Sequence, residues 1–176
     1  MRFIKDGKPA VDRFQRIAED APIAPDVAVL LPAARFLAEA EARISRGAET
    51  GVLWPNNRDI AELAPHLGRV AAVALVFPNF RDGRAYSQAR LLRERYRYDG
   101  ELRATGQVLR DQFLLMLRAG FDAFEVVKDA DADHFADAVR RYSRFYQASV
   151  DRRPVIASER LVRDQPSEAV PVRAAS

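Results

Sequence analysis

Hydrophobic positions along this chain alternate between short apolar runs and stretches with helical spacing. Apolar runs bounded by proline, glycine or charged residues predict buried strands. Five such runs are found, at residues 26–31, 51–55, 71–77, 101–105 and 121–127. Between them, apolar residues recur every three or four positions, as Ala85, Ala89 and Leu92 do, which is typical of the inner face of a helix. Repeated strand–helix units favour a sheet of parallel strands.

The pattern predicts a single α/β domain over residues 1–149. Its parallel sheet of about five strands is expected to carry helices on both sides. A partial βα barrel is the alternative, since the runs are too few for a complete eight-stranded barrel. Asp6-Gly7 accepts the positive φ angles of a tight turn, so residues 1–14 should contain a small hairpin. From residue 150 to residue 176 the periodicity is lost, and we expect an extended or disordered tail.

The composition argues against several kinds of chemistry. The 176 residues include no cysteine and two histidines, His66 and His134, so the sequence predicts no disulfide, no thiolate nucleophile and no metal site. No glycine-rich nucleotide loop follows a predicted strand, and we expect no cofactor. A net charge of +3 with mixed signs gives no indication of nucleic-acid binding. Neither a membrane-spanning run nor an apolar signal segment is found, which predicts a cytoplasmic protein that does not bind membranes.

Charged residues gather after the third and fourth predicted strands, at the edge where parallel α/β sheets bind ligands. Between Arg81 and Arg118 the sequence has nine arginines against five acidic residues. Free N–H groups at the start of a helix, combined with arginine side chains, attract oxyanions. The residues expected to bind such a ligand are Asp82, Gly83, Arg84, Ser87, Gln88, Arg103, Gly106 and Arg110.

Arg103 stands out because it lies inside an apolar strand, where a guanidinium group is costly unless it is paired. It either pairs with the carboxylate of Asp82 or Asp111, or remains available for a ligand. The oxyanion hypothesis requires that the turns carrying Arg84 and Arg103 meet to form one electropositive niche.

Two other interpretations stay open. In the first, the chain is a small enzyme in which Asp82 or Asp111 is the general acid or base and Arg84 and Arg103 stabilise negative charge. In the second, the chain is a non-catalytic interaction module that docks a partner through one helix face. That face carries Arg90, Arg93 and Arg97, although such a row of arginines is also typical of an ordinary solvated surface.

A long motif carries a family resemblance. It runs from Phe77-Pro-Asn-Phe-Arg-Asp-Gly-Arg84 through Gly100-Glu-Leu-Arg-Ala-Thr-Gly106 to Gly120-Phe-Asp-Ala-Phe124. Over residues 73–124 the chain resembles the bacterial domain-of-unknown-function family 934. The resemblance implies a protein described as an oxidoreductase involved in sulfite reduction and encoded beside assimilatory sulfite reductase.

The preferred hypothesis is an accessory protein of bacterial sulfate or sulfite assimilation. It would bind an oxyanion, or dock to sulfite reductase or another sulfur-assimilation enzyme, through the arginine-rich edge. A second copy of the chain, forming a homodimer, is a further candidate partner. Because thiols, metal ligands and a nucleotide loop are lacking, we do not expect the chain to move electrons unaided, and an oxidoreductase activity is implied by the resemblance alone.

Overall fold

Eight strands form one sheet in the computed structural model, which describes residues 2–44, 47–126, 134–140, 142, 145–151 and 155. The strands are β1 (Arg2–Lys5), β2 (Lys8–Ala10), β3 (Gln15–Arg16), β4 (Val29–Pro32), β5 (Thr50–Trp54), β6 (Ala72–Phe77), β7 (Glu101–Gly106) and β8 (Ala123–Val126). Their order across the sheet is β2-β1-β8-β7-β6-β5-β4-β3. Strands β3 to β8 are parallel, and the β1–β2 hairpin joins the sheet antiparallel to β8.

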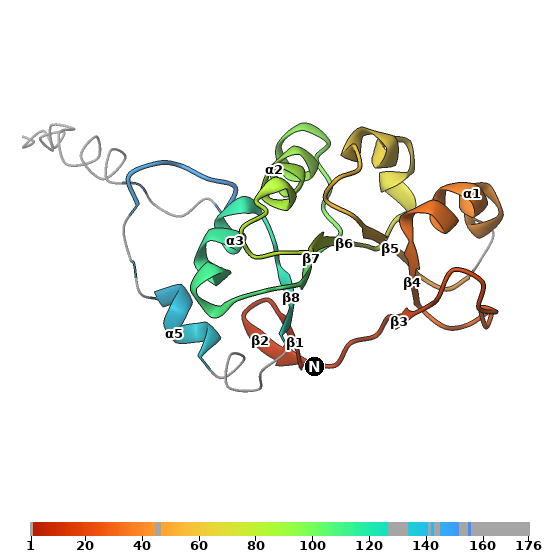
Figure 1. Ribbon diagram of the computed structural model, residues 1–176, viewed down its shortest axis with the longest axis horizontal. Coiled ribbons are helices and arrows are strands. Elements are labelled where there is room, and N and C mark those ends of the chain that lie inside the picture. Colours follow the sequence, from red (N-terminus) through yellow and green to blue (C-terminus); the bar gives the residue numbers. More distant parts are fainter. Residues whose placement is uncertain are drawn as a thin grey trace, which may run out of the picture.

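The sheet curls into a half-barrel, with the helices along its outer side (Figure 1). These are α1 (Ala33–Ile44), the 3-10 helix η1 (Ile60–Arg69), α2 (Arg84–Arg90), its π-helical continuation η2 (Leu91–Arg95), the 3-10 turn η3 (Arg110–Gln112), α3 (Phe113–Ala119) and α5 (Phe135–Arg140). Each new parallel strand is added beside the previous one. Because crossovers of one hand then place their helices on the same face, the other face of the sheet is left concave and without helices.

The five predicted parallel strands and the hairpin are confirmed, but two features of the predicted sheet are wrong. Helices cover one side rather than both, since the strand order never reverses along the parallel part of the sheet. The sheet is also larger than expected, because β1, β2 and the two-residue strand β3 extend it at its two ends. The partial barrel, stated above as the alternative, describes this curled sheet better than an open sheet does.

Side-chain alternation gives the two faces of the sheet different chemistry. On β6, Val73, Leu75 and Phe77 are fully buried in the main hydrophobic core beneath the helices. Ala72 and Ala74 point the other way, into a small apolar cluster on the concave face. On β7, Leu102 and Ala104 face the helices. The polar side chains that alternate with them, Glu101, Arg103 and Thr105, face the concave side.

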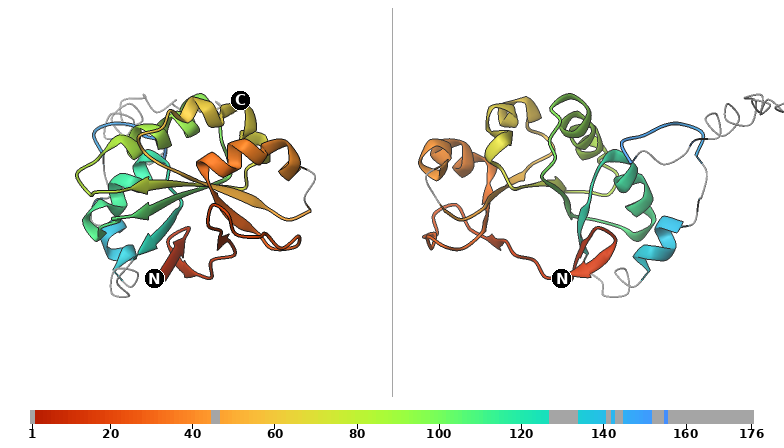
Figure 2. Two further views of the ribbon diagram at one scale, coloured as in Figure 1. Left: turned by 45° about the vertical axis from the view of Figure 1, so that its right-hand side comes forward. Right: turned by 180° about the vertical axis from the view of Figure 1, so that it is seen from behind.

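After β2, the chain crosses the concave side of the sheet before it reaches β3 (Figures 1 and 2). We call residues 11–14 the strap. Its first residue, Val11, is 93% exposed, whereas the ring of Phe14 is buried against the sheet. The strap therefore covers polar side chains that would otherwise face solvent.

Parts of the C-terminal predictions lie outside the described residues. Of the predicted tail at residues 150–176, only residues 150, 151 and 155 are described. Phe135 of α5 is buried, whereas Tyr142 follows the end of α5 at Arg140 and is 58% exposed. Among the helices described, none combines the length and apolar character that crossing a membrane requires.

Candidate functional site

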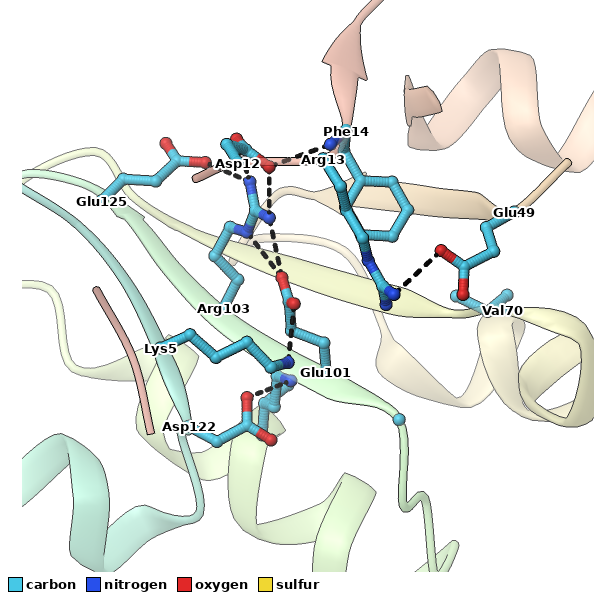
Figure 3. A network of polar contacts seen from close by, with 12 residues as sticks. Lys5, Asp12, Arg13, Phe14, Glu49, Val70, Glu101, Arg103, Asp122 and Glu125 are labelled. Atoms are coloured by element: carbon cyan, nitrogen blue, oxygen red, sulfur yellow. Dashed lines mark hydrogen bonds and ion pairs between the residues drawn. The ribbon is translucent and has the colours of Figure 1, made fainter. Parts of the chain in front are cut away.

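Arg103 lies at the centre of an ion network on the concave face (Figure 3). Its side chain has no exposed surface. The guanidinium donates to both carboxylate oxygens of Asp12 at 2.7 and 2.8 Å, to Glu101 Oε1 at 2.9 and 2.7 Å, and to Glu125 Oε1 at 3.0 Å. The group also lies 4.2 Å from the ring centre of Phe3, which adds a cation–π contact.

Two further cations complete the network at its rim. Lys5 Nζ lies 2.7 Å from Glu101 Oε2, and Arg16 donates to Thr105 Oγ1 at 2.7 Å and pairs with Glu125. Three cations thus face three carboxylates, and each carboxylate has a cationic partner. Because the charges balance locally, the network ties the N-terminal residues to the sheet and leaves no excess positive charge for an anionic ligand.

Opposing effects set the protonation of the central pair. Burial acts to raise the pKa of Asp12, but hydrogen bonds from Arg103 and from the Phe14 N–H outweigh it and hold this pKa below its usual value. Burial likewise acts to lower the pKa of Arg103, whereas bonds to Asp12 and the charge of Glu101 raise it. Both groups are therefore charged at neutral pH.

The niche expected from Arg84 and Arg103 is not formed. Arg103 pairs with neither Asp82 nor Asp111, because alternation along β7 turns it into the concave face. Arg84 begins α2 on the outer side, where its Nε and Nη2 donate to Asp82 at 2.9 and 2.6 Å. This bidentate bond holds the pKa of Asp82 far below its usual value, so Asp82 carries no proton to donate as a general acid at neutral pH.

Other residues predicted to bind a ligand have structural contacts instead. Gly106 has a φ of +91°, and a Cβ there would lie 2.4 Å from the carbonyl oxygen of Phe77, so the turn after β7 requires glycine. Gln88 is buried, and its Nε2 donates to the Arg58 carbonyl at 2.7 Å. Gly83 adopts an ordinary negative φ at the start of α2.

The three arginines of the predicted docking face, Arg90, Arg93 and Arg97, do not share one exposed surface. Arg93 is mostly buried and donates to the carbonyls of Tyr98, Gly100 and Gly120 at 2.6–3.0 Å, and it pairs with Asp122 at 2.9 Å. It is a clamp between η2 and the turns beside β7, so it is unavailable to a partner. The chain changes from α-helical to π-helical spacing after Arg90, which is why an α-helical projection placed Arg93 on the outer face.

Arg90 and Arg97 are on the surface, as expected. Arg90 Nη2 lies 3.0 Å from Glu94 one turn away. Arg97 is exposed and adopts a left-handed φ of 54° in the turn that leads to β7.

The loops that follow β6 and β7 are joined at the carboxyl edge of the sheet. The Phe80 N–H donates to Gln107 Oε1 at 3.2 Å, and Gln112 Nε2 donates to the Phe80 carbonyl at 3.0 Å. Phe80 and Leu109 are 42% and 39% exposed. Arg81 stacks on the Phe80 ring.

Four residues of these loops form what we call the carboxyl-edge surface: Phe80, Arg81, Leu109 and Arg110. Within the described part of the chain, neither Arg81 nor Arg110 has a carboxylate partner. They differ in this from Arg84, Arg93 and Arg103, whose charges are neutralised internally. The carboxyl-edge surface therefore combines exposed apolar groups with unpaired positive charge.

A cavity of about 420 Å³ adjoins this surface. Its lining includes Arg110, Asp111, His134, Asp137 and Tyr142. The structure thus brings two predicted site residues, Arg110 and Asp111, together with three residues from the following helical region. No group of three or more potential metal ligands occurs among the described residues.

Sequence reasoning missed both the partners of Arg103 and the cavity residues after position 133. One signal for the network was available. Glu101, Arg103 and Thr105 follow a period of two, which places all three on one face of a strand, and Glu125 occupies the same face of the neighbouring strand. Nothing local indicated Asp12, which is separated from Arg103 by 91 positions.

Comparison with known proteins identifies one family. The model of the family described as bacterial protein of unknown function (DUF934) matches residues 51–156, from β5 onward, and confirms the resemblance found in the sequence. The matched range contains Glu101, Arg103 and Glu125 but not the strap. No curated protein and no solved structure matches the chain.

Proposed function

Since the chain belongs to the DUF934 family of bacterial proteins of unknown function, we propose that it is an accessory protein of sulfate or sulfite assimilation. It docks to sulfite reductase, or to a related sulfur-assimilation enzyme, through the carboxyl-edge surface. The resemblance stated above supplies the metabolic setting of this proposal, and the chemistry of the surface supplies the mode of binding.

The observation that carries the proposal is the combination of exposed apolar and unpaired cationic side chains on two joined loops. Phe80 and Leu109 offer apolar area, while Arg81 and Arg110 have no carboxylate partner among the residues that the structure describes. Aromatic and arginine side chains are enriched at the energetic centres of protein interfaces. The matching partner surface is acidic and contains an apolar recess.

Docking fits this edge better than capture of free sulfite or sulfate. Arg110 lines its cavity together with the carboxylates of Asp111 and Asp137, and like charges repel a small dianion. A protein partner can place its acidic groups against the two arginines and keep them away from the two aspartates.

A second candidate function is a small enzyme with Asp111 as its general acid or base. The observation in its favour is that Asp111, His134 and Arg110 line one cavity, and a carboxylate and an imidazole are both suited to proton transfer. This hypothesis predicts that Asp111→Asn folds but fails to restore growth on sulfate to a strain that lacks the gene. Full complementation by Asp111→Asn would count against it.

The docking proposal is tested by measuring the affinity of the purified protein for sulfite reductase from the same organism. Phe80→Ser and Arg110→Glu should each weaken binding by about tenfold or more. Arg97→Glu is the matched control, because Arg97 is exposed beside the opposite end of β7 and should leave the affinity unchanged. Absence of binding by the unmodified protein, or equal binding by Arg110→Glu, would overturn the proposal, as would a loss confined to Arg97→Glu.

A further inference from the structure

The strap covers Arg103 with a carboxylate that belongs to no strand. A guanidinium has five N–H donors, and all five of Arg103 are used: three donate to Glu101 and Glu125 of the sheet, and the other two donate to Asp12. Nη1 and Nη2 each give Asp12 one bond, at 2.7 and 2.8 Å (Figure 3). This is the two-bond geometry with which arginine binds a free carboxylate.

The charge balance of the concave network depends on this one strap residue. Without the Asp12 carboxylate, the two glutamates of β7 and β8 would face three cations, Lys5, Arg16 and Arg103. The rest of the network therefore carries one net positive charge, which Asp12 neutralises. The Arg103 side chain has no exposed surface, so its attraction for a carboxylate is weakly screened.

The middle of the strap is held only by side chains. Residues 11–13 are exposed, and no backbone hydrogen bond joins them to the sheet within the part of the chain that the structure describes. Their anchors lie at either end, where Ala10 ends β2 and the Phe14 ring is buried. Besides Asp12, the middle has one ion pair, made by Arg13, whose two side chains are 53% and 47% exposed and which solvent screens. Residues 11–13 can therefore lift from the sheet as a short loop while both anchors stay in place.

We propose that the concave face holds a binding site for a small monocarboxylate, which Asp12 fills in this structure as an internal competitor. An external carboxylate accepts the two N–H groups of Arg103 that Asp12 releases, and residues 11–13 lift from the sheet. Since the Asp12 side chain is 33% exposed, a small anion can reach this pair from solvent.

The charge of the site selects a monoanion. One positive charge remains to be neutralised when Asp12 leaves, whereas the second charge of a dianion would be repelled by Glu101 and Glu125. No residue of the carboxyl-edge surface takes part, so the site is independent of the docking function proposed above.

Removing the internal competitor tests the proposal. Acetate is titrated by calorimetry at pH 7 and constant ionic strength, with acetamide as the uncharged control. A ligand that must displace an internal group binds with an affinity reduced by the fraction of sites already filled, so Asp12→Ala should bind acetate about tenfold or more tightly than the unmodified protein. Asp82→Ala is the matched control, because it also frees an arginine from a two-bond carboxylate. That arginine, Arg84, is 58% exposed, and no acetate binding is expected there.

The unmodified protein provides a second measurement that does not depend on the folding of a variant. In nuclear magnetic resonance spectra, the backbone amides of residues 11–14 should shift as acetate is added, because the strap loses its ion pair, and acetamide should leave them unchanged. Arg103→Met lacks the guanidinium, so acetate should not shift these amides in that variant. Sulfate, a dianion, should bind Asp12→Ala more weakly than acetate does.

The proposal is overturned if Asp12→Ala binds acetate no more tightly than the unmodified protein, or if Asp82→Ala gains the same affinity. It is also overturned if acetate leaves the amides of residues 11–14 of the unmodified protein unshifted. Tighter binding of sulfate than of acetate would refute the class of ligand. Phe80→Ser and Arg110→Glu should not alter acetate binding, which separates this result from that of the docking experiment.

Discussion

Replacing Arg103 by methionine tests the interpretation of the concave network as a structural lock. The substitution keeps an unbranched side chain of similar length but removes the charge. Glu101 and Glu125, which are almost fully buried, then lose their shared cation. Lys5 and Arg16 remain beside them at the rim, so Glu101 and Glu125 each keep one positive neighbour, whereas Asp12 loses its bidentate partner.

The expected loss follows from that geometry. Removing one partner of a buried ion pair destabilises a protein by about 3–5 kcal/mol, because a buried charge is left uncompensated. Since Lys5 and Arg16 remain, we place Arg103→Met near the lower limit, at about 3 kcal/mol. In a protein of this size that loss lowers the melting temperature by about 6–12 °C. It is a large share of a typical total stability of about 5–15 kcal/mol.

The assay is thermal and urea unfolding followed by circular dichroism, with Arg84→Met as the matched control. Arg84 also makes a bidentate bond to a carboxylate, but its side chain is 58% exposed, and solvent screens the pair. The control should therefore change the melting temperature much less. Equal stability of Arg103→Met and the unmodified protein, or an equal loss in Arg84→Met, would refute the structural role assigned to the network.

Three further predictions concern the same framework. The folded-state pKa of Asp12 lies below its unfolded value. Its contribution to stability is therefore present at neutral pH and is lost as the pH falls below about 4. In urea unfolding, Asp12→Asn should have a lower free energy of unfolding than the unmodified protein at pH 7, and this difference should be smaller at pH 3. Gly106→Ala should destabilise the fold by more than about 2 kcal/mol through its positive φ and the clash with the Phe77 carbonyl. Gly83→Ala should be close to neutral in the same denaturation experiment, because a Cβ there would make only an ordinary contact with the Tyr86 ring at 3.9 Å. Arg93→Ala leaves three part-buried carbonyls without a donor and should cost about 2 kcal/mol in urea unfolding. Stability equal to that of the unmodified protein would mean that the clamp is not needed.

Local patterns were sufficient to find the parallel strands but not the curvature of the sheet. The apolar runs that became β4 to β8 are long enough to be recognised without tertiary information. Gln15–Arg16, by contrast, is a strand of two residues without an apolar side chain, and it forms because its neighbour β4 offers free backbone groups. Which face the helices cover depends on strand order, and no single repeat contains that information.

The candidate site was harder to predict because its members come from distant parts of the chain. The sequence identified Arg103 as a guanidinium that is costly inside an apolar strand unless it is paired, and left open whether Asp82, Asp111 or a ligand would be its partner; the structure pairs it with three other carboxylates. The partner was sought among nearby aspartates, although the fold supplies Asp12 from the N-terminal strap and Glu125 from the next strand. Arg110 and Asp111 were identified through their position after β7, a rule that depends on topology rather than on contacts.

The pairing of β1 with β8 has a consequence for how this protein is made. Arg2 lies opposite Val126, so β1 cannot take its place in the sheet until β8 has been synthesised. During that interval the β1–β2 hairpin has no neighbouring strand in the sheet. Closing so long a loop is entropically costly and slows folding, which delays the addition of the hairpin to the sheet.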